Sequence, residues 1–353
     1  MTRREALRRI AALNLWTLTC LAGRGEGVCD MSGIKDLPVS PTTVPVPAGG
    51  AGMLAPSGGP PLHRGLRVMV FAPHPDDETL GAGGLLQLVR ASQGTVRVVF
   101  VTCGDGYVEG ARNHYGRAGL APKDFIEYGR MRWFETVRAM KSLGVGNGDM
   151  ELLGFPDAGI HALLSTHWGA ELAYVSPHTL MSRPPYPECR DTDIRYTGSS
   201  LSRSISDSIA EFSPHWVVLP DPLDRHPDHR AVALFVLGAL SCLDGSQRVQ
   251  VESMRILTYF IRTSPFPASP EGARTAGAAG HSAPSAVRVP LRFALGEKER
   301  RAKEQALLHY TSQQFLLSPV LSRFVAPFEV FGQVEPVVVT DRNCLWNRLP
   351  ATG

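Results

Sequence analysis

Residues 68–84 read VMVFAPHPDDETLGAGG: an apolar run ends in a histidine and a proline, and three consecutive acids and a glycine-rich segment follow. Three adjacent carboxylates repel one another, so this cluster costs stability unless positive charge lies beside it. The apolar run predicts a strand over 66–72, and the spacing after the acids predicts a helix over 80–91. The acids therefore lie in a turn between a strand and a helix.

A second turn of the same character lies further along the chain. Residues 216–230 read WVVLPDPLDRHPDHR, in which acids and histidines again follow a short apolar run. We expect a strand over 216–220 and a helix over 231–240. Both turns contain the triplet His-Pro-Asp, and both connect a strand to a helix.

The segments between these turns alternate in the same way, with a strand expected over 96–102 and helices over 125–143 and 201–212. Strands that alternate with helices predict an α/β fold, Rossmann-like, with a mostly parallel sheet and helices on both faces. In such a sheet, functional side chains gather beyond the carboxyl ends of the strands. We therefore expect the two turns to face each other across a crevice.

Together the two turns could supply imidazoles and carboxylates to one cation. His74 and Asp77 are three residues apart, as are His226 and His229, so a helical turn would point the members of each pair the same way. Two histidines and one carboxylate leave positions open for water and substrate, as a hydrolytic zinc site requires. A carboxylate outside the metal shell could then deprotonate the water. The same ligand set also suits non-haem iron, so Fe2+ is an alternative to Zn2+.

The first turn has two other possible interpretations, a helix cap and a dinucleotide-binding loop. A lone His-Pro-Asp triplet is more often a capped helix start, in which Asp76 or Asp77 would cap the following helix. Two such triplets at equivalent strand ends favour a site over a pair of caps. The glycines Gly81, Gly83 and Gly84 do not have the G-x-G-x-x-G spacing of a dinucleotide-binding loop, and the acids before them would repel a pyrophosphate.

Composition narrows the possible partners. The chain has 353 residues, 43% of them hydrophobic, and a formal net charge of +3, which is ordinary for a globular protein. The basic residues of the N-terminal segment account for this charge, and the near-neutral remainder indicates no nucleic-acid partner. Six cysteines are present but none forms a C-x-x-C pair, so we do not expect a thiolate zinc site.

The composition of the sequence divides the chain into a leader, a linker, a catalytic domain and an insertion within that domain. Residues 1–30 resemble a secretory leader, because a basic cluster with a twin arginine precedes an apolar run that is too short to be a comfortable membrane span. We therefore expect an exported protein (periplasmic, cell-surface or secreted), or a cytoplasmic one if the leader is not functional. A Pro/Gly-rich linker is expected over 31–62, and a single catalytic domain over 63–345 with a flexible insertion at about 264–286.

The two turns also carry a family resemblance. FAPHPDDETLGAGG at 71–84, together with PDPLDRHPDHRA at 220–231, resembles the PIG-L/LmbE superfamily of zinc-dependent N-acetylglucosaminyl de-N-acetylases. Weaker matches are VTCGDG at 101–106, Arg132-x-x-Glu135, LLGFPD at 152–157 and KEQALLHYTSQ at 303–313. The resemblance implies an LmbE-like fold and a hydrolase that removes the N-acetyl group from a GlcNAc-type sugar conjugate, either a small molecule or a glycolipid.

The resemblance also implies roles for individual residues. His74, Asp77 and His229 would bind zinc. Asp76 would be the general base that activates the metal-bound water and later passes a proton to the departing amine. These assignments explain the acidic cluster, since a divalent cation would offset its charge.

Other residues would act around that centre. His226 would donate a hydrogen bond to the tetrahedral oxyanion, and Asp228 would orient an imidazole. Arg132 and Asp157 match sugar-binding positions, although Arg132 could equally be a solvated helix residue and Asp157 a turn former. Glu78 is expected to support the turn or an arginine. A catalytically silent sugar-binding protein is the alternative from outside the enzymes.

Overall fold

The computed structural model describes residues 59–169, 171–245, 248–261, 290–314 and 322–334, together with 336 and 339. The leader over 1–30, most of the linker over 31–62 and the insertion at about 264–286 lie outside these residues. Their predicted boundaries therefore stay predictions.

The described residues form one seven-stranded sheet with the strand order β3-β2-β1-β4-β5-β7-β6. The strands are β1 (Arg67–Ala72), β2 (Thr95–Thr102), β3 (Met150–Phe155), β4 (Trp216–Pro220), β5 (Arg255–Tyr259), β6 (Leu291–Ala294) and β7 (Phe328–Val334). The first five strands pair in parallel, whereas β7 pairs antiparallel with both β5 and β6. The prediction of a mostly parallel sheet is confirmed.

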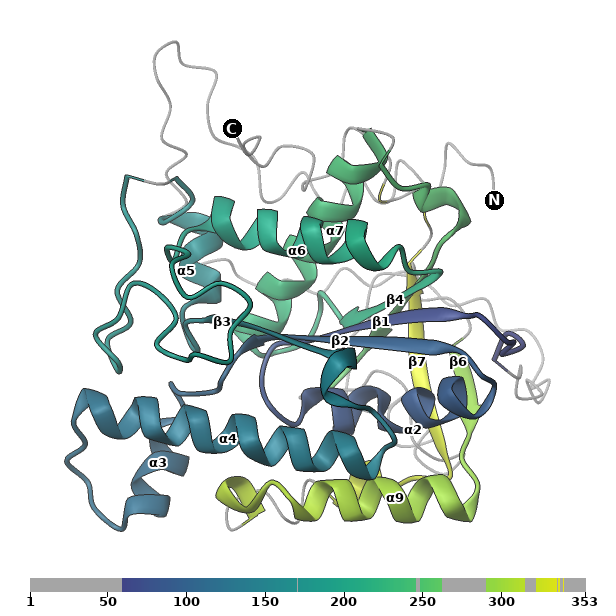
Figure 1. The fold of residues 1–353 in the computed structure, drawn as a ribbon, viewed down its shortest axis with the longest axis horizontal. Coiled ribbons are helices and arrows are strands. Elements are labelled where there is room, and N and C mark those ends of the chain that lie inside the picture. Colours follow the sequence, from purple (N-terminus) through teal and green to yellow (C-terminus); the bar gives the residue numbers. More distant parts are fainter. Residues whose placement is uncertain are drawn as a thin grey trace, which may run out of the picture.

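Helices cover both faces of this sheet. Figure 1 shows α2 (Asp77–Ala91), α4 (Pro122–Ser142) and α9 (Glu297–Leu308) on one face, and α5 (Ile160–Ser165), α6 (Gly198–Phe212) and α7 (Pro227–Gly245) on the other. Further helical segments of the described residues include α3 (Val108–Tyr115), η3 (Asn147–Asp149), η4 (Val251–Ser253) and η5 (Ser322–Phe324). No helix of the described residues combines the length and apolar character that a membrane crossing needs.

The central strands are apolar throughout because both of their faces are covered. In β1, Val68 and Val70 pack into the core on one face of the sheet, and the alternate residues Met69 and Phe71 pack into the core on the other. This period of two divides the interior into two layers, one on each side of the sheet.

The predicted strands over 66–72, 96–102 and 216–220 are confirmed as β1, β2 and β4. The two helices that follow the His-Pro-Asp turns begin earlier than expected. α2 begins at Asp77 and α7 at Pro227, because proline and acidic side chains are favourable in the first turn of a helix. Asp77, which directly follows the first triplet, and Asp228, the acid of the second triplet, therefore belong to the helices.

The glycine-rich part of α2 serves packing. The N–H groups of Gly84 and Leu85 both donate to the Glu329 carboxylate, at 2.7 and 2.8 Å. Lys303 Nζ forms an ion pair with Glu329 at 2.6 Å and also donates to the carbonyl of Leu80. A Cβ atom on Gly84 would lie 2.5 Å from both methyl groups of Leu295 and 3.0 Å from Glu329 Cδ, so glycine allows both side chains to approach the helix backbone.

The sheet topology places the two predicted turns side by side. The chain runs from β1 outward through β2 to β3, and then returns to the opposite side of β1 as β4. The reversal point lies between β1 and β4, and ligands of open α/β sheets bind beyond the strand ends at such a point. Both His-Pro-Asp turns follow these two strands.

Candidate metal centre and active site

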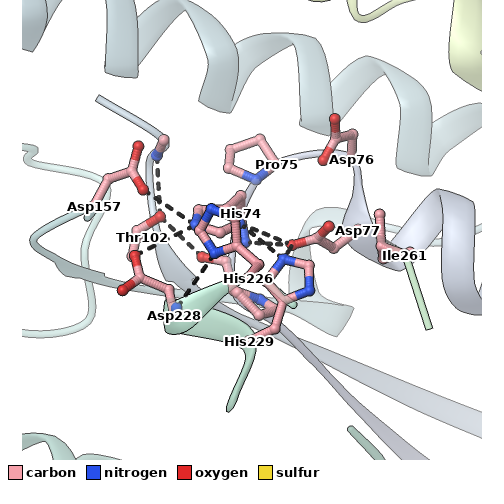
Figure 2. A network of polar contacts seen from close by, with 12 residues as sticks. His74, Pro75, Asp76, Asp77, Thr102, Asp157, His226, Asp228, His229 and Ile261 are labelled. Atoms are coloured by element: carbon pink, nitrogen blue, oxygen red, sulfur yellow. Dashed lines mark hydrogen bonds and ion pairs between the residues drawn. The ribbon is translucent and has the colours of Figure 1, made fainter. Parts of the chain in front are cut away.

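The three predicted ligands lie in direct contact with one another. Asp77 Oδ2 is 3.1 Å from His74 Nδ1 and 3.2 Å from His229 Nε2. The two imidazole nitrogens are themselves 3.3 Å apart. Figure 2 shows the rings and the Asp77 carboxylate converging from the turn after β1 and the start of α7. The sequence-predicted pairing of the two distant turns therefore matches the geometry.

These three atoms fit one face of a zinc coordination shell. Zinc binds imidazole nitrogen and carboxylate oxygen at about 2.0–2.2 Å in a tetrahedral arrangement, which separates neighbouring ligand atoms by about 3.3 Å. The distances of 3.1, 3.2 and 3.3 Å among His74, Asp77 and His229 agree with that separation. Two histidines and a carboxylate also leave room for a water molecule and a substrate oxygen.

Carboxylates contact the far nitrogens of both rings. His229 Nδ1 is 3.3 Å from Asp224 Oδ2. His74 Nε2 is 3.1 Å from Asp157 Oδ1 and 3.5 Å from Asp228 Oδ2. Carboxylates in this position orient a metal-binding imidazole and raise its basicity. Asp228 thus lies where the predicted orienting role places it, and Asp224, which the sequence reasoning did not single out, has the same relation to His229.

Burial and mutual attraction shift the pKa values of this cluster. Burial lowers the pKa of His229, but Asp77 and Asp224 outweigh it and raise the value to about 9. The pKa of His74 is likewise raised above its usual value, because Asp157 outweighs burial. Burial raises the pKa of Asp77, but the His229 charge outweighs it and holds the pKa well below its usual range. Without a cation the cluster holds protons, and a divalent cation can take their place.

His226 lies beside the two ligand rings. Its ring centroid is 4.7 Å from that of His74 and 4.8 Å from that of His229. Burial first, and then the neighbouring His74 and His229, lower its pKa to about 4. The ring is therefore neutral near pH 7. Its Nδ1 accepts the Asp228 N–H at 3.3 Å, which places the remaining proton on Nε2 as a hydrogen-bond donor.

The three histidines also form a second possible ligand group, since donor atoms of His74, His226 and His229 lie within 4.8 Å of one another. A third group consists of His74, Asp157 and Asp228. The group with Asp77 has the tighter spacing. His226 is a hydrogen-bond donor beside the ligand group with Asp77 and a ligand in the group of three histidines.

Asp76 occupies the N-cap position of α2, yet its side chain makes no capping hydrogen bond. The interpretation of this residue as a simple cap is therefore not supported. Its backbone has φ 112°, which is rare for a residue other than glycine and costs about 1–3 kcal/mol. Figure 2 shows its carboxylate directed differently from that of Asp77. Burial and the adjacent Asp77 charge raise its pKa to about 8, which a neighbouring cation would lower again.

The two predicted sugar-binding residues are buried. Arg132 is 3% exposed, and its two Nη atoms donate to the carbonyls of Gly104 and Pro75, at 2.7 and 2.9 Å. Arg132 is thus not a solvated helix residue. Asp157 is 5% exposed and accepts the N–H groups of Gly106 and Ala158 besides contacting His74. Both residues lie at the carboxyl edge of the sheet, and their contact with a sugar stays a prediction.

Comparisons with known proteins agree with this geometry. The family described as GlcNAc-PI de-N-acetylase, PIG-L, matches residues 69–240, which include both turns. Residues 69–240 belong to the PIG-L family. The predicted resemblance is confirmed.

One curated relative of this PIG-L domain is the 1D-myo-inositol 2-acetamido-2-deoxy-alpha-D-glucopyranoside deacetylase of Rhodococcus opacus (strain B4). It is 29% identical over 188 residues, which cover 52% of this chain and 55% of the relative. The match thus spans about half the length of each protein.

Solved structures also resemble this chain in fold. The A40926 pseudoaglycone deacetylase Dbv21 has a TM-score of 0.49 at 19% identity, with 76% of this chain and 97% of that chain covered. The zinc inhibited form of teicoplanin deacetylase Orf2 has a TM-score of 0.47 at 17% identity, with the same coverage. At this distance the likeness concerns the fold alone.

Proposed function

We propose that this protein is a metal-dependent N-deacetylase that hydrolyses the N-acetyl group of a GlcNAc-type sugar conjugate. The observation that carries the proposal is the convergence of His74, Asp77 and His229 within 3.3 Å of one another. The neighbouring Asp76 has a side chain that makes no capping hydrogen bond. The family match and the curated relative support the choice of an acetylated amino sugar as substrate.

In this proposal His74, Asp77 and His229 would hold the cation, with Zn2+ as the first candidate and Fe2+ as the second. A bound divalent cation supplies a water molecule of lowered pKa and polarises the amide carbonyl. Proton transfer is then carried out by a side chain outside the ligand group. Asp76 accepts a proton from the attacking water and delivers it to the amine nitrogen as the C–N bond breaks.

His226 stabilises the oxygen of the tetrahedral centre. Its neutral ring has Nδ1 occupied by the Asp228 N–H, so Nε2–H is the group that can donate to the developing oxyanion. Asp228, Asp157 and Asp224 keep the ligand rings oriented. The products are acetate and a free amino sugar.

Two competing functions predict different results. A catalytically silent sugar-binding protein would bind the same substrate without releasing amine. An iron enzyme with oxygen chemistry would use the same ligands for oxidation. The buried, strained Asp76 favours hydrolysis, because neither alternative needs an extra carboxylate with a disfavoured backbone beside the metal ligands.

The decisive experiment is an amine-release assay over a panel of N-acetylated glucosamine conjugates, including glycolipids. The enzyme is assayed as purified, after chelation, and after return of Zn2+ or Fe2+. We expect release to disappear with chelation and to return with one of the metals. An absence of amine release from every substrate by the metal-loaded protein would refute the proposal.

We further propose export of the protein, as the sequence of residues 1–30 suggests. Fractionation of cells that express the full chain, followed by N-terminal sequencing, tests this. Recovery of an intact N-terminus in the cytoplasm would contradict it.

A further inference from the structure

The peptide bond between Pro75 and Asp76 is fixed at both of its polar groups. The Pro75 carbonyl accepts from Arg132 Nη2 at 2.9 Å and from Gln313 Nε2 at 3.2 Å. The N–H of Asp76 donates to Glu78 Oε2 at 3.1 Å. Three side chains therefore hold one peptide unit, and one of them comes from 238 residues away in the sequence.

Glu78 is itself held from the C-terminal part of the chain. The Tyr310 hydroxyl donates to Glu78 Oε1, and Thr79 Oγ1 donates to the same oxygen at 2.8 Å. Thr79 Oγ1 and the Tyr310 hydroxyl are 3.0 Å apart, which closes a small buried network. Glu78, Thr79 and Tyr310 are fully buried, so this network is shielded from water.

The direction of the Asp76 carboxylate depends on this backbone. The side chain makes no capping hydrogen bond to the helix, and φ is 112°. A residue in such a conformation persists only where its surroundings hold it there. The side-chain contacts to the Pro75 carbonyl and the Asp76 N–H hold the peptide on one side of this φ angle, and the Leu80 N–H donates to the Asp76 carbonyl on the other side, at 2.9 Å.

We propose that Tyr310 and Gln313 are positioning residues for Asp76: through Glu78 and the Pro75 carbonyl, they hold its strained backbone so that the carboxylate faces the reacting water. We call the set Glu78, Arg132, Tyr310 and Gln313 the peptide clamp. This inference deepens the proposed function and rests on it, because Asp76 is taken as the base. It assigns a role to the sequence KEQALLHYTSQ at 303–313, in which none of the proposed metal ligands lies.

Two single-group variants test the clamp. Tyr310→Phe removes one hydroxyl, and Gln313→Met removes the amide donor while keeping the side-chain length. Matched controls are Tyr196→Phe, which removes a buried hydroxyl bonded to the Gly154 carbonyl, and Gln87→Met, which removes an amide bonded to the carbonyls of Gly83 and Glu299.

Kinetics on the zinc-loaded enzyme provide the first measurement. We expect kcat to fall by about 10- to 100-fold in both clamp variants, because a misplacement of about 1 Å has an effect of that size. KM and bound zinc should stay at wild-type levels, and the controls should keep wild-type kcat. An unchanged kcat in both clamp variants, or a loss of zinc that accounts for the lower kcat, would overturn the proposal.

A double-mutant cycle then separates positioning from general weakening. Each clamp substitution is combined with Asp76→Ala. We expect no further loss of kcat in the Asp76→Ala background, because the side chain that the clamp positions is gone. Equal factors in both backgrounds would show that the clamp acts on something other than Asp76.

Hydrogen exchange tests the clamp without any catalytic turnover, so its result does not depend on the proposed function. Hydrogen exchange of the peptide that covers 74–80 should become faster in Tyr310→Phe than in Tyr196→Phe, since the acceptor of the Asp76 N–H loses a partner. If wild type releases no amine, the deacetylase proposal fails while this measurement still decides on the clamp. Equal exchange in the two tyrosine variants would overturn it.

Discussion

His229 Nδ1 lies 3.3 Å from a carboxylate oxygen of Asp224, on the side of the ring opposite the Nε2 atom that faces Asp77. Asp224 is fully buried and also accepts the N–H groups of His226 and Ile261. The imidazole of His229 is therefore held between two carboxylates, one in the ligand group and one behind it. This arrangement fixes the ring so that Nε2 points to the cation site.

We predict that Asp224→Asn weakens metal binding by about 10- to 100-fold, because the ring of His229 loses an orienting carboxylate. The dissociation constant for Zn2+ is measured by competition with a chelator. Asp221→Asn is the control, since Asp221 lies in the same turn but bonds Thr258 and the Leu223 N–H. Equal affinities for Asp224→Asn and wild type would contradict the prediction.

The role of His226 is tested against that of His229. We expect His229→Ala to abolish stoichiometric zinc, because it removes a ligand atom 3.2 Å from Asp77. His226→Ala should keep zinc and lose about 100- to 1,000-fold in kcat, as the removal of an oxyanion donor does. Metal analysis of both variants decides. Loss of zinc from His226→Ala would favour the ligand group of three histidines.

Asp76→Ala should lose about 100- to 10,000-fold in kcat, which is the usual contribution of general acid–base catalysis. Zinc content and the affinity for a substrate should remain, because Asp76 is outside the predicted ligand group. Metal analysis and calorimetric binding of an N-acetylglucosaminide check this. A variant that keeps wild-type kcat would remove Asp76 from the mechanism.

The centre of the fold and of the site could be predicted from the sequence because its signals are local. Each His-Pro-Asp triplet lies in the turn that follows an apolar strand, and parallel strands bring their carboxyl ends to one edge. Asp224 could also have been predicted from the sequence, since it lies in the same turn as His226 and His229. A carboxylate five residues before a ligand histidine is a signal that a search for imidazole partners could have found.

The contributions of the C-terminal part could not be predicted in this way. Glu78 supports the turn as expected, but its partner Tyr310 is separated from it by 232 residues. Such a contact depends on how α9 packs against α2 and α4, which no local pattern encodes. β6 and β7 were not predicted either, since β6 is only four residues long and only partly buried. The inward direction of Arg132 likewise follows from tertiary packing.

Asp105 gives a prediction on pH. Burial, and then the Asp157 charge, raise its pKa from 3.8 to about 7, although the Tyr186 hydroxyl donates to it. The folded state therefore retains a proton that the unfolded state releases, so this contribution to stability is complete below pH 3.8 and is lost as pH rises through about 7. Asp105→Asn carries no such charge. The free energy of unfolding of Asp105→Asn should therefore rise relative to that of wild type by on the order of 4 kcal/mol between pH 4 and pH 8.

Urea unfolding of both proteins, in the presence of a chelator, measures this difference at several pH values. The chelator keeps metal binding from adding its own pH dependence. A constant difference between Asp105→Asn and wild type over the whole range would show that the folded protein does not hold the proton.

The buried ion pair between Lys303 and Glu329 yields a prediction on stability. Lys303→Met leaves the Glu329 carboxylate buried beside α2 without its cation, which should cost about 3–5 kcal/mol. Lys303→Met combined with Glu329→Gln should recover part of this loss, since both charges are then gone. Arg301→Met is the control. It breaks an exposed ion pair with Glu297 and should cost less than about 1 kcal/mol. Urea unfolding measures the free energy of unfolding of each variant. If Lys303→Met lowers it by no more than Arg301→Met does, the ion pair between Lys303 and Glu329 does not stabilise the packing against α2.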